Sequence, residues 1–284
     1  MKFKDILIMS DIDGTFTDSQ SRLVKRNLDA VEYFKANGGL FAIASGRVPE
    51  SMGRLSPIIP TLANIPCICC NGAFLYDFVR RERIGEIDLN TEKTVELIKK
   101  VRAEFPEVGI RISSRVGYCI PHLNEYISRE LADHVERLKA EGNYHVGDID
   151  SLPCVGWTRT AFCSDADTLG RVRERFGEEY SEWFSFSKAS IDIYEFQDKS
   201  ATKGTALGRL RTYLINSGRA TGQLKIYAIG DYENDLGMLR SCDVPACPDN
   251  AIPAVKEIAK LRLCHCDNGA IADLIEAIEA DIDK

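Results

Sequence analysis

Four short apolar runs constrain the fold of this chain most strongly. They are Ile6–Met9, Leu40–Ala44, Pro66–Cys70 and Leu224–Ile229. Near-continuous apolar runs are typical of strands buried on both faces, whereas strands with one solvated face alternate. After the first run, apolar residues at 28, 31 and 34 keep helical spacing up to Gly38-Gly39. The pattern therefore predicts βα units and a parallel sheet that is covered on both faces.

The middle of the chain has a different pattern. Alternating strands such as Ile110–Ile112 and Ile191–Tyr194 are separated by charged amphipathic helices at Glu92–Phe105 and Glu125–Ala140. The 284 residues suffice for two hydrophobic cores. We expect a doubly wound, Rossmann-like α/β core with an inserted α+β domain. The expected boundaries are residues 1–82 and 198–284 for the core and 83–197 for the insertion.

Composition excludes several classes of protein. The net charge of −7, without a Lys/Arg-rich block, argues against a nucleic-acid partner. No apolar stretch reaches the roughly 18 residues that a bilayer requires, and the N-terminal segment does not resemble a signal peptide. We therefore expect a cytoplasmic protein without a membrane partner.

The ten cysteines do not predict a disulfide framework, because several lie inside apolar runs of a long chain. Neither Cys67/Cys69/Cys70 nor Cys264-His265-Cys266 contains the CxxC pairs of a structural zinc site. Reduced, buried thiols are expected.

Polar residues follow the apolar runs in a coherent set. They are Ser10–Thr15 after the first run, Ser45–Arg47 after the second and Gly230–Asp235 after the last. In open α/β sheets the ligand crevice lies beyond the carboxyl ends of the strands, so these segments are expected to meet there. Each segment alone has a simpler interpretation: a solvated acidic turn, an ordinary βα turn and a helix cap, respectively.

Together, the acidic residues predict a divalent cation. At ~4 Å and an effective dielectric constant near 20, each pair of carboxylates repels by roughly 4 kcal/mol, and a cation offsets this. Magnesium prefers oxygen ligands. A calcium loop starting at Asp11 fits poorly, since its sixth and twelfth positions would be Phe16 and Arg22. Lys203, at the start of an amphipathic helix, could supply a cation that grips phosphate.

The ordered set of motifs resembles the four motifs of haloacid-dehalogenase-superfamily phosphatases. The motifs are Asp11-x-Asp13-Gly14-Thr15, Ser45-Gly46-Arg47, Lys203-Gly204 and Gly230-Asp231-x-x-Asn234-Asp235. Asn71-Gly72-Ala73 and Asp249-Asn250-Ala251 are similar to the Cof-type branch, whose α/β cap (class IIB, type C2) lies between the second and third motifs. The run Cys247–Asn250 departs from the usual sequence there.

The resemblance implies a role for each matching residue. Asp11 would be the nucleophile that forms an aspartyl phosphate, and Asp13 the general acid and base. Mg²⁺ would be held by Asp11, the Asp13 carbonyl, Asp231 and Asp235. The residues expected to bind the substrate phosphate are Ser45, Gly46, Lys203 and Asn234, with Arg47 and Asn71 as further candidates for substrate contact.

The function that we expect is hydrolysis of a small phosphorylated metabolite. By family analogy, sugar phosphates are the first substrate class to expect. A phosphomutase or phosphotransferase is the alternative, because an aspartyl phosphate can return its phosphoryl group to another hydroxyl. A non-catalytic, phosphate-binding switch is a third hypothesis, which the order of the motifs disfavours. In the inserted domain, the candidates for a substrate roof are Arg115, Tyr118, His122 and Trp157, and sequence does not choose among them.

Overall fold

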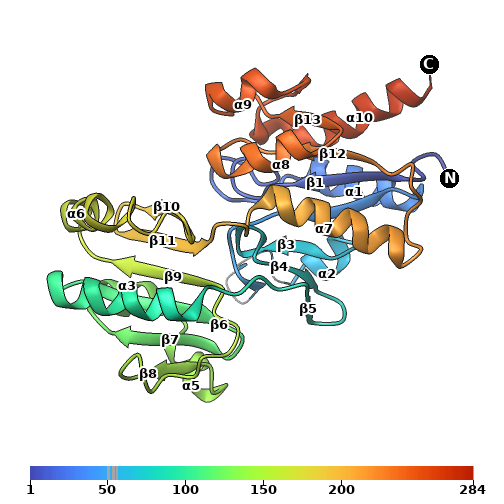
Figure 1. Cartoon of the computed structure of the whole chain (residues 1–284). Helices are drawn as coiled ribbons and strands as arrows, with labels where there is room; N and C mark the ends of the chain where they lie inside the picture. Colours follow the sequence, from blue (N-terminus) through green and yellow to red (C-terminus); the bar gives the residue numbers. More distant parts are fainter. Residues whose placement is uncertain (50–51, 53–54, 56, 284) are drawn as a thin grey trace. The chain divides into compact units, whose positions relative to one another are not determined.

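The computed structural model describes residues 1–49, 52, 55 and 57–283 (Figure 1). It divides into two compact units, one of Met1–Gly85 with Ala201–Lys284 and the other of Glu86–Ser200. Both boundaries lie slightly later than residues 82/83 and 197/198. The strand β5 (Glu82–Ile84) pairs with β4 (Phe74–Asp77) and so belongs to the first unit, whereas β11 (Ile193–Asp198) extends the sheet of the second.

A parallel sheet of five strands forms the centre of the first unit, in the order β14-β13-β12-β1-β2. The strands are β1 (Ile6–Ser10), β2 (Leu40–Ile43), β12 (Lys225–Ile229), β13 (Val244–Cys247) and β14 (Leu261–Arg262). Ser10 at the end of β1 is in register with Ile43 and Ile229, so three strands end at the same level. All residues of β1 are buried, which confirms the predicted parallel sheet with both faces covered.

Helices cover this sheet in two groups. The helices are α1 (Lys25–Ala36), α2 (Ile59–Leu62), α7 (Lys203–Asn216), α8 (Leu236–Ser241), α9 (Pro253–Ile258) and α10 (Ala270–Ile282). Helix α1 packs against α10, and α7 packs against α8. The crossovers β1-α1-β2 and β12-α8-β13 run in opposite directions along the sheet, so their right-handedness places α1 and α8 on opposite faces. Helix α9 ends at Ile258 because Ala259 is extended and β14 follows.

The third apolar run was expected to join the parallel sheet, and this prediction is wrong in part. The strand β3 (Cys67–Cys69) pairs antiparallel with β4 in a three-stranded sheet, β3-β4-β5. Its link to β2 is a parallel bridge between Ala44 and Ile68. The chain reverses directly after β3, where Asn71 and Gly72 both have positive φ, so the run continues into a hairpin and not into a βα crossover.

The second unit is an α+β domain with a six-stranded sheet in the order β10-β11-β9-β6-β7-β8. The remaining elements are β6 (Gly109–Ser114), β7 (Gly117–His122), β8 (Tyr144–Val146), β9 (Arg159–Cys163), β10 (Phe184–Ser190), α3 (Thr91–Glu104), α4 (Glu125–Leu131), α5 (Val135–Ala140) and α6 (Ala166–Phe176). All pairings except β7 with β8 are antiparallel. The inserted α+β fold is thereby confirmed, although the single helix predicted at Glu125–Ala140 is two helices.

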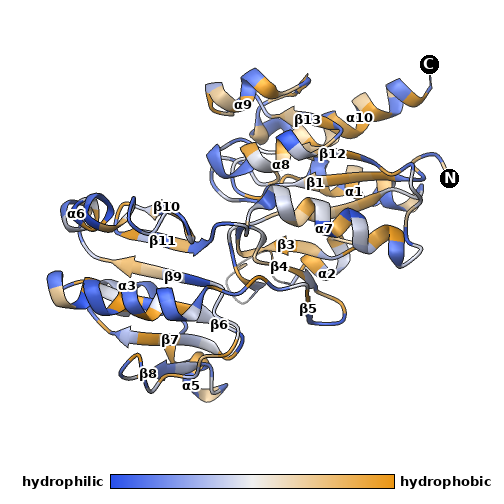
Figure 2. Cartoon of the chain, in the orientation of Figure 1, coloured by the Kyte–Doolittle hydropathy of each residue, from blue (hydrophilic) through white to orange (hydrophobic). Residues whose placement is uncertain are grey.

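Two apolar clusters stabilise this unit, one on each face of its sheet. Helices α3 and α6 contribute to the larger cluster, which includes Leu97, Val172 and Phe162. Helices α4 and α5 contribute to the smaller one, which includes Leu131 and Leu138. Figure 2 shows the apolar residues concentrated in the strands, with helices such as α3 carrying both polar and apolar residues. This is the amphipathic pattern from which the helices were predicted.

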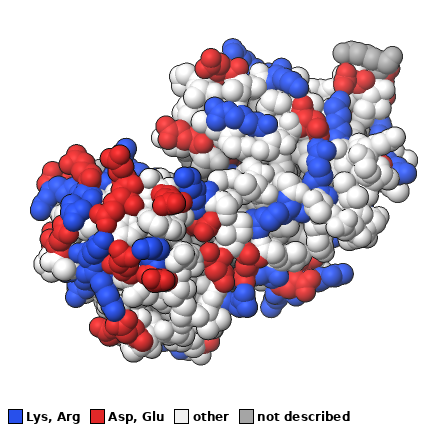
Figure 3. All heavy atoms as spheres, in the orientation of Figure 1, with Lys and Arg blue, Asp and Glu red and all other residues white. Residues whose placement is uncertain are grey.

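The surface is mixed in charge. On the face drawn in Figure 3, Lys and Arg side chains are interspersed with Asp and Glu. Within residues 1–49, 52, 55 and 57–283, no helix combines the length and the apolar character that crossing a bilayer would require.

Candidate active site

The first acidic residue of the site is fixed at the carboxyl edge of the parallel sheet. Asp11 follows β1 directly, and its amide donates a hydrogen bond to the carbonyl of Ile229 in β12, at 3.0 Å. The Asp11 residue is only 8% exposed. The ends of two adjacent strands therefore determine where this carboxylate lies.

Lys203 reaches this carboxylate from the first turn of α7. Thr202 caps the helix: its hydroxyl accepts from the Thr205 amide, and the Thr205 hydroxyl accepts from the Thr202 amide. The Lys203 side chain is completely buried, with Nζ 2.6 Å from Asp11 Oδ1 and 2.7 Å from Asp235 Oδ1. The first and third motifs thus meet through an ion pair.

The Asp235 side chain binds the backbone of the fourth motif. Its Oδ2 accepts hydrogen bonds from the amides of Asp231, at 3.0 Å, and Tyr232, at 3.2 Å, while its Oδ1 accepts from Lys203. Both oxygens of this fully buried carboxylate therefore have protein partners. The turn that presents Asp231 is held in place by Asp235.

Asp231 lies against the loop that follows Asp13. Thr15 Oγ1 donates to Asp231 Oδ1 at 2.7 Å. Gly14, between Asp13 and Thr15, has φ +76°, and a Cβ atom there would lie 2.7 Å from Asp231 Oδ2. Only glycine combines this φ with such a close approach. Thr15 was not predicted as a site residue, although its place in the first motif is a signal for this role.

Three carboxylates of the site could share a cation. Asp11, Asp231 and Asp235 each offer an oxygen, and these oxygens lie within 4.8 Å of one another. A set of oxygen donors alone fits Mg²⁺. Asp11 and Asp231 are the better candidates for direct ligands, because the oxygens of Asp235 have the partners described above. The Asp13 carboxylate lies outside this group.

Burial makes two carboxylates of the site, those of Asp11 and Asp231, costly to ionise, and a bound cation would offset this cost. Burial raises the pKa of Asp231 to about 6; Thr15 opposes this shift and Asp235 adds to it. Burial also raises the pKa of Asp11 well above its ordinary value, against the effect of Lys203. For Lys203, burial disfavours the ammonium, but Asp11 and Asp235 more than compensate and raise its pKa. Lys203 therefore stays charged beside the Asp11 carboxylate, which burial makes costly to ionise.

Asp13 and Arg47 form a second ion pair at a more exposed position. Arg47 Nη2 lies 3.0 Å from both carboxylate oxygens of Asp13, and Nε lies 3.2 Å from Oδ2. The two side chains are 48% and 41% exposed, respectively. Next to Arg47, Ser45 is buried, and its hydroxyl accepts the Arg47 amide at 3.1 Å. The first and second motifs are thus in contact.

The remaining predicted phosphate-binding residues connect the second, third and fourth motifs. Asn234 Nδ2 donates to Asn71 Oδ1 at 3.4 Å. A Cβ atom on Gly46 would lie 2.9 Å from the same Asn71 oxygen. One on Gly72 would lie 2.1 Å from the carbonyl oxygen of Thr202. The structure therefore brings every predicted site residue of the core into one continuous group.

Asn250, where the sequence departs from the usual run, is also tied to this group. Its Nδ2 donates to the Gly14 carbonyl at 2.7 Å, and its Oδ1 accepts the Cys266 amide at 3.0 Å. Asn250 therefore supports the loop that carries Asp13.

The four candidates of the inserted domain have separate local partners. Arg115 pairs with Glu86, and His122 Nδ1 contacts the carbonyl of Val108 at 2.8 Å. The guanidinium of Arg111 lies 4.7 Å from the ring centroid of Tyr118. Trp157 is 2% exposed and lies in the larger apolar cluster, so it packs the domain core.

Known proteins resemble this chain in sequence and in fold. The family model of the haloacid dehalogenase-like hydrolases matches residues 8–275. An uncharacterised hydrolase of Schizosaccharomyces pombe, C25B8.12c, is 25% identical over 96% of this chain and 90% of its own length. The pyridoxal phosphate phosphatase YbhA of Escherichia coli is 22% identical over 95% of this chain and 97% of its own length. The solved structure of the subclass IIB sugar phosphatase BT4131 aligns with a TM-score of 0.73 at 17% identity, covering 96% of this chain and 98% of that one.

The chain belongs to the haloacid dehalogenase-like hydrolases. This confirms the family predicted from the four motifs, its fold, and the expectation of an enzyme of the phosphatase class.

Proposed function

We propose that this protein hydrolyses phosphomonoesters of small metabolites, with Mg²⁺ as cofactor and a phosphoryl group carried transiently on Asp11. The observation that carries the proposal is the ammonium of Lys203 bridging Asp11 and Asp235, at 2.6 and 2.7 Å. A buried cation beside the nucleophile is what a negatively charged phosphoryl group needs in order to approach a carboxylate.

In this mechanism Asp11 attacks phosphorus and the ester oxygen leaves. Lys203 offsets the charge on the transferring phosphoryl oxygens. Mg²⁺ held by Asp11 and Asp231 would neutralise further charge on these oxygens. The buried Ser45 hydroxyl and the Gly46 amide are the proposed phosphate contacts from the second motif, and Asn234 from the fourth.

Asp13 is the proposed general acid and base. It donates a proton to the leaving alcohol and afterwards accepts one from the water that hydrolyses the aspartyl phosphate. Arg47 holds both oxygens of the Asp13 carboxylate. Asp13 must therefore break at least part of its ion pair with Arg47 in order to contact the leaving group during turnover.

The proposed substrates are small phosphorylated compounds, with sugar phosphates first. BT4131 is described as a sugar phosphatase and YbhA as a pyridoxal phosphate phosphatase, which favours this class without choosing within it. The inserted unit, Glu86–Ser200, is the proposed cap that sets specificity. We also propose that the protein acts in the cytoplasm, where its ten free cysteines would remain reduced.

A panel of phosphorylated metabolites tests this function. Phosphate release and the fate of the organic product are measured with Mg²⁺ and with a chelator. We expect free phosphate in a 1:1 ratio to substrate consumed, and loss of turnover with the chelator. An isomerised phosphosugar without free phosphate would support the mutase alternative. Failure of every substrate, including a generic aryl phosphate, would contradict the proposal.

A further inference from the structure

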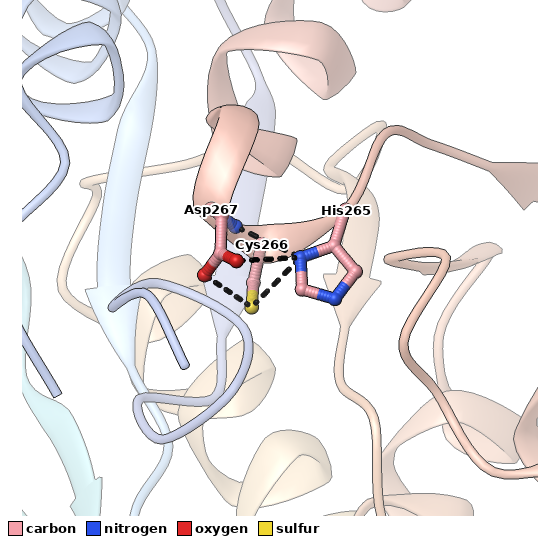
Figure 4. A group of neighbouring side chains, drawn as sticks. All are labelled: His265, Cys266 and Asp267. Atoms are coloured by element: carbon pink, nitrogen blue, oxygen red, sulfur yellow. Dashed lines mark hydrogen bonds and ion pairs between the residues drawn. The ribbon is translucent and has the colours of Figure 1, made fainter. Parts of the chain in front are cut away.

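A second group of metal-ligating side chains lies outside the four motifs. Figure 4 shows His265, Cys266 and Asp267 with their side chains directed toward one another. They belong to the turn between β14 and α10, and each offers a ligand atom within 4.8 Å of the other two. None of them has a role in the proposed phosphatase mechanism.

We propose that these three residues bind a zinc-type divalent cation. Cys266 Sγ lies 3.7 Å from His265 Nδ1 and 3.7 Å from Asp267 Oδ1, and Nδ1 lies 3.3 Å from Asp267 Oδ2. Around tetrahedral zinc, metal–ligand distances of ~2.0–2.3 Å give edges between sulfur, nitrogen and oxygen of roughly 3.4–3.6 Å. The two Asp267 distances involve different carboxylate oxygens, and His265 Nδ1 also accepts the Asp267 amide at 3.3 Å. One ligand atom from each residue lies within 4.8 Å of the other two, so the side chains must rotate slightly to share one ion.

The donor set distinguishes this site from the acidic cluster. Asp11, Asp231 and Asp235 offer only oxygen, which suits Mg²⁺. A thiolate, an imidazole and a carboxylate instead favour zinc and its spectroscopic substitute cobalt. The thiol must give up its proton to the solvent when the ion binds.

Neighbouring residues already hold two of the ligands. The Asp267 carboxylate accepts the Ser19 amide on Oδ1 at 2.7 Å, and Oδ2 faces His265. The Cys266 amide is bound by Asn250. Outer hydrogen bonds of this kind orient metal ligands. The Cys266 residue is 1% exposed, whereas the His265 and Asp267 side chains are 38% and 45% exposed, so the two outer ligands are accessible to solvent and the thiol is buried behind them.

This group differs from Cys264-His265-Cys266, which lacks the CxxC pairs of a structural zinc site. In the structure the third member of the group is Asp267, and Cys264 is not part of it. Three protein ligands leave a fourth position for water, which is typical of an open site and not of a four-ligand structural one.

Cobalt titration of the full-length protein in saturating Mg²⁺ and a non-thiol reductant tests the proposal. Mg²⁺ occupies the oxygen site, and only a thiolate ligand gives the near-ultraviolet cobalt charge-transfer absorption. We expect this absorption to saturate at about one equivalent of cobalt and to disappear when Zn²⁺ is added. Cys266→Ser should abolish it, and the matched control Cys264→Ser should retain it. No absorption in the wild-type protein, or equal absorption in Cys266→Ser, would overturn the proposal.

Variants of the two outer ligands keep the test decisive if Cys266→Ser fails to fold. Asp267→Asn keeps an oxygen for the Ser19 amide but weakens metal coordination, and His265→Ala removes the imidazole. Both should raise the cobalt dissociation constant about tenfold or more. An unchanged dissociation constant in both variants would overturn the assignment. Cobalt absorption does not depend on turnover, so the result tests the metal site independently of the phosphatase proposal.

Discussion

Lys203 and Asp235 form an ion pair with an Nζ–Oδ1 distance of 2.7 Å, and neither side chain is exposed to solvent. Asp11 is the second partner of the same ammonium. Residues far apart in the chain therefore share one buried charge network at the edge of the sheet. Removal of the ammonium would leave two buried carboxylates without their cation, which costs more than the ion pairs contribute to stability.

Substitution of this lysine should cost both stability and activity. Lys203→Met leaves the two buried carboxylates without their cation, so we expect the free energy of unfolding to fall by about 3–5 kcal/mol. Urea denaturation with a chelator present measures this. The control is Lys225→Met, whose exposed ammonium lies 3.5 Å from Asp281 and should contribute less than about 1 kcal/mol. Equal losses in the two variants would contradict the assigned network.

The raised pKa of Asp231 predicts a pH dependence of stability in the metal-free protein. Its folded-state pKa is about 6 against an ordinary 3.8, so the folded protein binds this proton more tightly than the unfolded chain. The resulting stabilisation is complete below about pH 4 and is lost as the pH rises through about 6. Asp231→Asn keeps an oxygen for Thr15 and removes the titration.

Thermal denaturation in chelator at about pH 4 and about pH 7.5 checks this sign. Relative to wild type, Asp231→Asn should gain stability at the higher pH, by on the order of 1 kcal/mol after allowance for solvent screening. A difference between the two proteins that does not change with pH would show that Asp231 does not titrate as described.

The turn after β3 predicts a sharp contrast between two glycines. Gly72→Ala would place a Cβ atom 2.1 Å from the Thr202 carbonyl at φ +103°, which must displace the start of α7 and Lys203. We expect a loss of stability greater than 1 kcal/mol and reduced turnover. Gly208, inside α7, has open space around its Cβ position, so Gly208→Ala should stabilise the protein by about 0.5–1 kcal/mol. Calorimetry of both variants measures these changes. A similar change in stability in the two variants would contradict this account.

Sequence predicted the parallel sheet well because its signal is local. Continuous apolar strands and helical spacing appear in the residues themselves, as at β1 and α1. The placement of β3 was missed because three consecutive residues with positive φ, Cys70, Asn71 and Gly72, reverse the chain. Such a turn is decided by backbone conformation that an apolar run does not reveal.

The composition of the site was predictable, whereas its internal bonding was not. The motifs named Asp11, Lys203 and Asp235, but no pattern indicated that Asp235 would bind Lys203 and two backbone amides. The contact between Asp13 and Arg47 likewise depends on side-chain geometry. The group at residues 265–267 was missed because Asp267 lies outside any cysteine spacing rule.

The central claim is that Asp11 is the residue that becomes phosphorylated. Asp11→Asn should retain nearly normal stability, because Lys203 keeps Asp235 as a partner. The surface variant Asp29→Asn, whose exposed carboxylate pairs with Lys25, serves as the control and should keep full activity.

The most direct measurement is Mg²⁺-dependent phosphate release from an aryl phosphate by wild type, Asp11→Asn and Asp29→Asn at equal concentrations. The account predicts that Asp11→Asn loses activity by about 10³-fold or more while remaining folded. Turnover by folded Asp11→Asn at a rate similar to wild type would contradict it.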